Sequence, residues 1–322
     1  MNEKTIATIG LKDGGFADLQ AVLREAAHWV EVAATQGANL AVLPETINLL
    51  RRSTDAAPLE EFALEDWRTA TALLCEAAAK HRISLVLPLL VRDGATLANR
   101  FYVLSREGSE LGFYQKRAPA TGERLAGVKP ASTAPIRWEG LMLGGAICID
   151  IYFPHHVFEP QMEAGADLFV IPSMTPAGAS LDYCAVTYGV PFVLSYSPWS
   201  RILDRDGKEL AAGGSRSETL RAGFGNPVQQ ATINFDAVSL FADFNQEKIQ
   251  DVQRHYGNKV GIRFDQPNCV FFLESRSADL SINEIMRQFG LVSRRDYFAQ
   301  LDPEAAHRTS PQNSSGRTVP AS

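Results

Sequence analysis

The chain has 322 residues, of which 45% are hydrophobic and 21% are charged, and its formal net charge is −6. This composition is typical of a globular protein, and a chain of this length can bury a core without disulfides or a structural metal. Lysines and arginines form no stripe along the sequence, so we expect no nucleic-acid partner and no electrostatic attachment to a membrane.

Apolar and β-branched runs alternate with segments whose apolar residues recur at helical spacing. In the first half of the chain, this pattern predicts a strand over residues 5–10, a helix over 16–36, a strand over 38–43, a helix over 59–81, and strands over 83–91 and 99–105. Gly37 follows the first of these helices, where a glycine commonly forms the C-terminal cap.

The second half of the chain continues the same alternation. It predicts strands over 136–138 and 142–147, a helix near 155–164, a strand over 168–172, a helix near 181–188, strands over 192–197, 200–203, 208–211 and 230–235, and a helix over 237–255. Ser281 and Glu284 have the spacing of a capping box, which predicts a last helix through Phe289 with Gly290 closing it. The alternation of helices, strands and hairpins implies an α/β fold in which helices cover apolar strands.

The four cysteines lie far apart, without a CxxC motif or a Cys/His cluster. This spacing argues against a zinc site or a disulfide framework and favours a reducing cytoplasm. The first ten residues lack the apolar core of a signal peptide. The most apolar stretch, residues 83–91, is about half the length that a membrane span needs. We therefore expect a soluble cytoplasmic protein.

Three residues with chemical potential stand at the ends of predicted elements. Cys148 lies where an apolar strand meets a turn and a following helix, a setting whose backbone N–H groups favour a thiolate. Glu45 ends the apolar run 40–44, where partial desolvation suits a general base. Lys116 follows an aromatic pair. Taken alone, each has a plainer explanation: a small buried thiol, a capping carboxylate and a solvent-facing lysine.

Taken together, these residues resemble the nitrilase superfamily of carbon–nitrogen hydrolases, and residues 4–265 carry the resemblance. The first matching motif is Leu43, Pro44 and Glu45, which follow a predicted strand. The second is Tyr114 and Lys116, which precede a proline-containing loop. The third is Cys148, followed by Asp150 and Pro154. Glu123 matches a second glutamate that many members carry after the lysine.

The resemblance implies a four-layer α-β-β-α sandwich of the nitrilase type with a Glu-Lys-Cys triad. In this family Glu45 would take the thiol proton, and Cys148 would attack an amide carbon to form a thioester. Lys116 would stabilise the oxyanion together with a backbone N–H, and Glu123 would orient Lys116 or the substrate nitrogen. The resemblance further implies a small amide and water as partners, no metal or organic cofactor, and a homo-oligomer.

Departures from the family pattern bear on the substrate. Nitrile hydrolases usually carry Cys-Trp-Glu at the nucleophile, whereas this chain has Ile149 and Asp150 after Cys148, which favours amides. Positions 151–153 lack the arginine that often binds a substrate carboxylate. The alternative that the same triad hydrolyses a nitrile or a carbamoyl amide stays open. The stretch 185–189 lacks the polar residues of many members, so a catalytically inactive binding or scaffold protein also stays open.

Further expectations concern the pocket and the domain limits. Tyr152 and Met174 are candidate substrate contacts, and Arg51 and Arg52 form either an anion contact or a solvated loop pair. We expect a hydrolase domain over 1–275, a C-terminal helical extension over 276–300, and a disordered tail over 301–322, where composition loses periodicity.

Overall fold

The structure is a computed structural model that describes residues 2–11, 16–50, 58–131, 133–214 and 227–301. The chain forms two compact units that divide between Phe235 and Asp236, and each is described here by itself. The assignment of residues 1–275 to one hydrolase domain stays a prediction, and the expected tail over 302–322 lies outside the described residues. No helix in the described ranges is long and apolar enough to cross a membrane.

The first sheet of the larger unit has six strands in the order β12-β1-β2-β3-β4-β5. Their bounds are β1 (Glu3–Ile9), β2 (Leu40–Val42), β3 (Ser84–Asp93), β4 (Thr96–Leu104), β5 (Glu110–Gln115) and β12 (Val228–Asn234). Strand β2 is parallel to both of its neighbours, with Ala41 opposite Ala7 and Leu85. Strands β3, β4 and β5 form an antiparallel meander.

The second sheet also has six strands, in the order β11-β10-β9-β8-β7-β6. Their bounds are β6 (Ile136–Trp138), β7 (Leu141–Gly145), β8 (Leu168–Ser173), β9 (Phe192–Tyr196), β10 (Ser200–Leu203) and β11 (Glu209–Gly213). Strands β7, β8 and β9 are parallel, and the remaining pairs are antiparallel. The parallel strands are almost entirely buried, as expected for a sheet covered on both faces.

The two sheets pack face to face because alternate side chains of each strand point to opposite faces. From the first sheet, Ile6, Leu40 and Val42 join Val170 and Val193 of the second sheet in one buried cluster. The intervening residues of the first sheet face helices instead. Two sheets thus form the middle layers of the unit.

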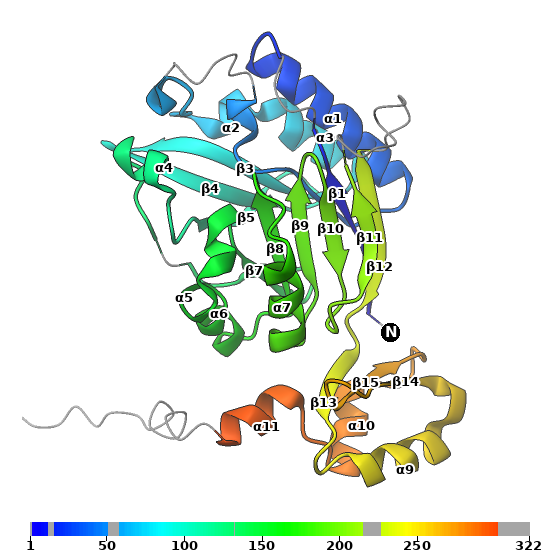
Figure 1. The fold of residues 1–322 in the computed structure, drawn as a ribbon. Coiled ribbons are helices and arrows are strands. Elements are labelled where there is room, and N and C mark those ends of the chain that lie inside the picture. Colours follow the sequence, from blue (N-terminus) through cyan, green and yellow to red (C-terminus); the bar gives the residue numbers. More distant parts are fainter. Residues whose placement is uncertain (1, 12–15, 51–57, 132, 215–226, 302–322) are drawn as a thin grey trace, which may run out of the picture. The chain divides into compact units, whose positions relative to one another are not determined.

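Helices cover the outer faces of both sheets (Figure 1). The first sheet packs against α1 (Leu19–Thr35), α2 (Trp67–Ala70) and α3 (Ala72–His81), and the second against α5 (Pro154–Val157), α6 (Glu159–Glu163) and α7 (Ala179–Tyr188). In the second set, Phe158 contacts Phe169 and Phe192 with ring centroids 4.8 and 5.3 Å apart. The predicted order of layers, α-β-β-α, is confirmed.

Gly145 at the end of β7 allows the two sheets to approach closely near the chain segment that carries Cys148. A Cβ atom at this position would lie 2.5 Å from Phe101 Cζ and 2.7 Å from Tyr114 Cγ. These two rings belong to the first sheet and stack with centroids 5.3 Å apart. Any larger residue would therefore push β7 away from β5.

The smaller unit contains the three-stranded sheet β13-β15-β14 and three helices. Their bounds are β13 (Ala237–Phe241), β14 (Val260–Asp265), β15 (Val270–Ser275), α9 (Gln246–Tyr256), α10 (Ile282–Phe289) and α11 (Arg294–Leu301). The predicted capping box is confirmed, since Ser281 caps the Glu284 N–H, and Gly290 ends α10 in the left-handed region.

Two predicted helices are wrong in part. Residues 59–81 do not form one helix, because Leu64 leaves the helical path to exchange backbone hydrogen bonds with β3. Asp66 then caps a new start at Trp67. Residues 237–241, predicted as helix, form the strand β13 because they pair with β15. The strands β5, β14 and β15 were not predicted.

Candidate active site

Glu45, Lys116 and Cys148 each follow the end of a strand. Glu45 comes three residues after β2, Lys116 directly after β5, and Cys148 three residues after β7. Strands β2 and β5 run in the same direction, because two successive antiparallel pairings separate β5 from β3. Their carboxyl ends therefore share one edge of the first sheet, while Cys148 comes from the second sheet.

Lys116 is a buried cation held between two carboxylates. Its Nζ lies 2.7 Å from Glu45 Oε1 and 2.8 Å from Glu123 Oε2, and its side chain is 2% exposed. Burial lowers the pKa of Lys116, but the charges of Glu45 and Glu123 outweigh burial and hold that pKa above its usual value. Lys116 therefore stays protonated near neutral pH, where it can act as a cation and a donor but not as a base.

Asn99 on β4 links the same two carboxylates and was not predicted. Its side-chain Nδ2 donates to Glu45 Oε1 at 2.8 Å and to Glu123 Oε1 at 2.7 Å. Its backbone carbonyl accepts the Lys116 N–H at 2.9 Å. Lys116, Glu45, Asn99 and Glu123 thus form a closed ring of hydrogen bonds. The sequence signal for Asn99 is weak, because this amide lies in a mostly buried strand next to another polar residue, Arg100.

Glu123 reaches Lys116 from the first turn of α4 (Thr121–Leu125). Its Oε2 also accepts the Ala120 N–H at 2.6 Å, which caps the start of this helix. The start of the helix and Lys116 therefore share the carboxylate of Glu123, and the catalytic role of Glu123 stays a prediction.

Cys148 begins a 3₁₀ turn that runs to Tyr152, and its backbone is left-handed with a φ of 51°. A residue with a Cβ rarely adopts this conformation, and such strain tends to occur at functional sites. The side chain is 8% exposed, and its Sγ lies 3.9 Å from Thr175 Oγ1. The turn thus points a nearly buried thiol toward the loop after β8.

The surroundings of Cys148 act on the pKa of its thiol in both directions. Burial raises the pKa of Cys148 and the charge of Glu45 raises it further, whereas Lys116 and the Met174 N–H lower it. The net direction is upward. Burial and Glu45 therefore outweigh the backbone donor and Lys116, and the expectation that this turn favours a thiolate stays a prediction. A thiol of this kind needs a base to remove its proton.

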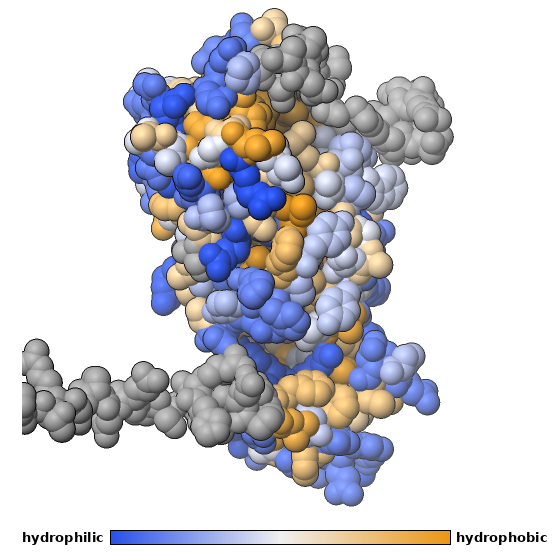
Figure 2. Space-filling model, turned by 60° about the vertical axis from the view of Figure 1, so that its left-hand side comes forward, coloured by the Kyte–Doolittle hydropathy of each residue, from blue (hydrophilic) through white to orange (hydrophobic). Residues whose placement is uncertain are grey.

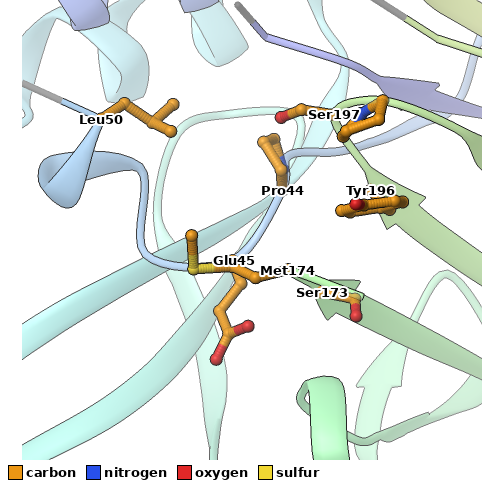
Figure 3. Close-up of a pocket in the computed structure, with 8 residues that line it drawn as sticks. Pro44, Glu45, Leu50, Ser173, Met174, Tyr196 and Ser197 are labelled. Atoms are coloured by element: carbon orange, nitrogen blue, oxygen red, sulfur yellow. The ribbon is translucent and has the colours of Figure 1, made fainter. Parts of the chain in front are cut away.

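A small cavity opens beside Glu45, and neither Lys116 nor Cys148 is among the residues that line it. It has a volume of about 60 Å³ and is lined by Pro44, Glu45, Leu50, Ser173, Met174, Tyr196, Ser197 and Pro198. Figure 3 shows Met174 beside Glu45, with Tyr196 and Ser197 across the cavity. Met174 also contacts the residue after Glu45, since its Sδ lies 4.0 Å from Thr46 Oγ1.

The two predicted substrate contacts differ in position. Met174 lines the cavity and is half-exposed, whereas Tyr152 is 52% exposed and is not among the residues that line it. Tyr152 is one of several large apolar side chains at the surface of the larger unit, where Figure 2 shows apolar atoms in patches among hydrophilic ones. Both assignments stay predictions, and Arg51 and Arg52 lie outside the described residues.

Comparison with known proteins finds a matching family model and related sequences. Residues 5–238 match the model of the carbon-nitrogen hydrolase family. The chain is 26% identical over 228 residues to the 2-oxoglutaramate amidase of Bacillus subtilis, and the match covers 65% of this chain and 86% of that protein. It is 28% identical over 211 residues to the tobacco bifunctional nitrilase/nitrile hydratase NIT4B, covering 59% of this chain and 60% of that protein.

Solved structures share the fold. A carbon-nitrogen hydrolase from Helicobacter pylori aligns with a TM-score of 0.60 at 16% identity, over 79% of this chain and 93% of that one. An amidase from Nesterenkonia sp. aligns with a TM-score of 0.57 at 19% identity, over 79% of this chain and 96% of that one. At these identities the likeness concerns the fold alone.

Proposed function

Because the chain belongs to the carbon-nitrogen hydrolase family, we propose that it hydrolyses the carbon–nitrogen bond of a small amide through a Cys148 thioester. The observation that carries the proposal is the buried ring in which Glu45 accepts hydrogen bonds from both Lys116 and Asn99, beside a thiol that needs a base. A cation, a carboxylate and a thiol are the groups that acyl transfer to cysteine requires.

The first half-reaction forms the thioester. Glu45 takes the proton of the Cys148 thiol, and the sulfur attacks the amide carbon to form a tetrahedral oxyanion. Lys116 and the backbone N–H that follows Cys148 stabilise this oxyanion. Glu45 then returns the proton to the leaving nitrogen, the carbon–nitrogen bond breaks, and ammonia or an amine departs.

The second half-reaction consumes one water molecule. Glu45 accepts a proton from the water as its oxygen attacks the thioester carbon, and Lys116 again stabilises the oxyanion. The carbon–sulfur bond then breaks, Cys148 regains the proton, and a carboxylic acid leaves. Glu45 suits both half-reactions because Lys116 and Asn99 both bond to its Oε1, so Oε2 can exchange the proton.

The size of the cavity supports a small substrate. A volume of about 60 Å³ accommodates roughly five water-sized groups, since a single water needs about 10–15 Å³ on this scale. Ser173, Tyr196 and Ser197 are among the residues that line it, and a partly polar lining suits an uncharged polar acyl group. The expected cytoplasmic location and homo-oligomer stay predictions.

The amide assignment rests on residues and on relatives. Ile149 and Asp150 follow the nucleophile where nitrile hydrolases usually have Trp and Glu. The Bacillus subtilis relative is an amidase that the match covers almost completely. In a mutant of the Nesterenkonia amidase, the acetamide moiety of fluoroacetamide is bound covalently at the active-site cysteine. That adduct supports a nucleophilic cysteine in a relative, and we propose that Cys148 is the nucleophile here and forms a thioester with its amide substrate.

Trapping of the acyl-enzyme tests the proposal. The protein is incubated in parallel with aliphatic amides, carbamoyl amino acids, an active ester and nitriles, while ammonia release and intact mass are followed. We expect ammonia from amides and one acyl adduct on the Cys148 peptide. Glu45→Gln should prevent both capture and release. Glu139→Gln should not, because this mostly buried carboxylate pairs with Lys4 at the opposite end of β7 from Cys148.

Other outcomes identify the alternatives. Adducts from nitriles alone would indicate a nitrile hydrolase on the same residues. Release of ammonia from carbamoyl compounds alone would indicate a carbamoyl-amide hydrolase. No adduct from any of these compounds would indicate a catalytically inactive binding protein.

A further inference from the structure

Asp150 is a fully buried carboxylate that takes no part in the steps above. It lies in the 3₁₀ turn that begins at Cys148, and its side chain has no exposed surface. Burial raises the pKa of Asp150, although hydrogen bonds from the surrounding donors act in the opposite direction. A buried carboxylate is costly unless donors surround it, so its partners indicate what it holds in place.

Four donors reach the two oxygens of Asp150. Its Oδ2 accepts the Tyr114 hydroxyl at 2.9 Å, the Ile147 N–H at 3.0 Å and the Arg117 N–H at 3.3 Å. Its Oδ1 accepts the Ala118 N–H at 2.7 Å. With both oxygens engaged in this way, Asp150 acts on its neighbours and not on a substrate.

These donors lie on both sides of the active site. Three of them belong to the segment 114–118, which has Lys116 at its centre and continues from β5 of the first sheet. The fourth, Ile147, directly precedes Cys148 and follows β7 of the second sheet. Asp150 therefore connects the backbone around the cation to the backbone beside the nucleophile, across the interface of the two sheets.

We propose that Asp150 is a positioning residue that holds Lys116 at a fixed place relative to Cys148. It does so by accepting hydrogen bonds from the backbone on either side of the gap between the two sheets. This inference rests on the proposed function, in which Lys116 must lie beside the oxyanion that forms on the Cys148 adduct. The ring of Glu45, Asn99 and Glu123 orients the lysine head group, and Asp150 orients the backbone that carries it.

The substitution Asp150→Asn tests this role at constant side-chain shape. The asparagine side chain has one acceptor oxygen and, in place of the second oxygen, an NH₂ donor. At least one of the four donors that bond to Asp150 would therefore face this NH₂ group and lose its hydrogen bond. Misplacing a catalytic group by about 1 Å can cost about a hundredfold in rate. We therefore expect kcat to fall about a hundredfold with KM changed less than about threefold, the pattern of lost transition-state stabilisation.

Alkylation of Cys148 by iodoacetamide provides a second measurement that needs no substrate. Lys116 lowers the pKa of the Cys148 thiol, so a displaced Lys116 should slow alkylation near neutral pH. The matched control is Asp167→Asn, because Asp167 also accepts a backbone N–H, from Met142 at 2.7 Å, at the start of β8. This control should leave kcat and alkylation unchanged.

If the Asp150→Asn protein does not fold, the milder substitution Tyr114→Phe tests the same role. It removes one of the four donors and leaves the carboxylate and the other three in place. We expect a loss of about fivefold in kcat, the scale of one hydrogen bond, together with slower alkylation. Its control is Tyr102→Phe, a buried tyrosine of the same sheet that stacks on Trp67.

The outcomes separate the inference from the proposed function. If the wild-type protein hydrolyses no amide, the proposed function fails, while slower alkylation in both variants still supports the role of Asp150. Unchanged kcat and alkylation in folded Asp150→Asn would overturn that role. Faster alkylation would also overturn it, because the charge of Asp150 and not its hold on Lys116 would then govern the thiol.

Discussion

Lys116 Nζ lies 2.7 Å from Glu45 Oε1, and both side chains are almost completely buried, at 2% and 4% exposure. A buried pair of this kind is a poor source of net stability, because desolvation of the charges offsets their attraction. Removing one partner, in contrast, leaves an unpaired charge in the interior. We therefore attribute the pair to catalysis and not to stability, since it places a cation and a proton acceptor together beside Cys148.

Cys148→Ser should leave the protein folded and lower turnover at least about a thousandfold, because a hydroxyl is a much weaker nucleophile than a thiol. Ammonia release from the preferred amide measures the effect. The controls are serine substitutions of the three other free cysteines, Cys75, Cys184 and Cys269. If one of these substitutions abolished activity and Cys148→Ser did not, the nucleophile would have to be assigned to that other cysteine.

Lys116→Gln should lower kcat by about two to three powers of ten, the scale for loss of an oxyanion donor. Glutamine can still donate to Glu45, so the ring loses its charge but keeps one hydrogen bond. The exposed Lys129, which follows the same segment of chain, provides the matched control as Lys129→Gln. Unchanged turnover in a folded Lys116→Gln protein would remove Lys116 from the mechanism.

Substitution of Glu45 and of Lys116 should shift the pH midpoint of Cys148 alkylation in opposite directions. Burial and Glu45 raise the pKa of Cys148, and Lys116 lowers it. Alkylation requires the thiolate, so its rate should rise with pH with a midpoint above that of an ordinary thiol. Glu45→Gln should move the midpoint to lower pH, and Lys116→Gln should move it to higher pH. Shifts in the same direction would contradict the arrangement described here.

Asn99→Leu should reduce both stability and activity. Two hydrogen bonds to carboxylates disappear, each on the scale of about 1.5–3 kcal/mol, and Glu45 loses one of the donors that bond to its Oε1. We expect a lower midpoint in urea and a fall in kcat of about tenfold or more. Asn245→Leu, another fully buried amide that bonds to backbone groups within residues 236–301, should lower stability and leave kcat unchanged.

Local patterns predicted much of the fold, whereas Glu45, Lys116 and Cys148 were selected through the family resemblance, and their roles stay predictions. The strands that carry Glu45 and Cys148 are apolar runs that end at polar positions, a signal contained in a few neighbouring residues. The ring around Lys116 was only partly predictable, because Asn99 meets its partners through the pairing of β3, β4 and β5. Lys116 was predicted from its flanks, although the strand β5 that carries it was not.

The errors have the same physical origin. Residues 59–81 carry a helical pattern, but Leu64 gains backbone hydrogen bonds to β3 that a continuous helix would exclude. The pKa of Cys148 depends on burial and on the charge of Glu45, and no local pattern in the sequence reports either. The sequence identified Asp150 only as part of the family motif. Its hydrogen-bond partners could not be predicted, because its four donors come from segments that follow strands of two different sheets.

The left-handed backbone at Cys148 has a consequence for choosing an inactive form of the protein. A side chain with a Cβ costs about 1–2 kcal/mol in this conformation, whereas glycine adopts it freely. The nucleophile thus occupies a position that favours glycine on conformational grounds alone. A protein carrying Cys148→Gly should be more stable than one carrying Cys148→Ala, so the cysteine is retained there at the expense of stability.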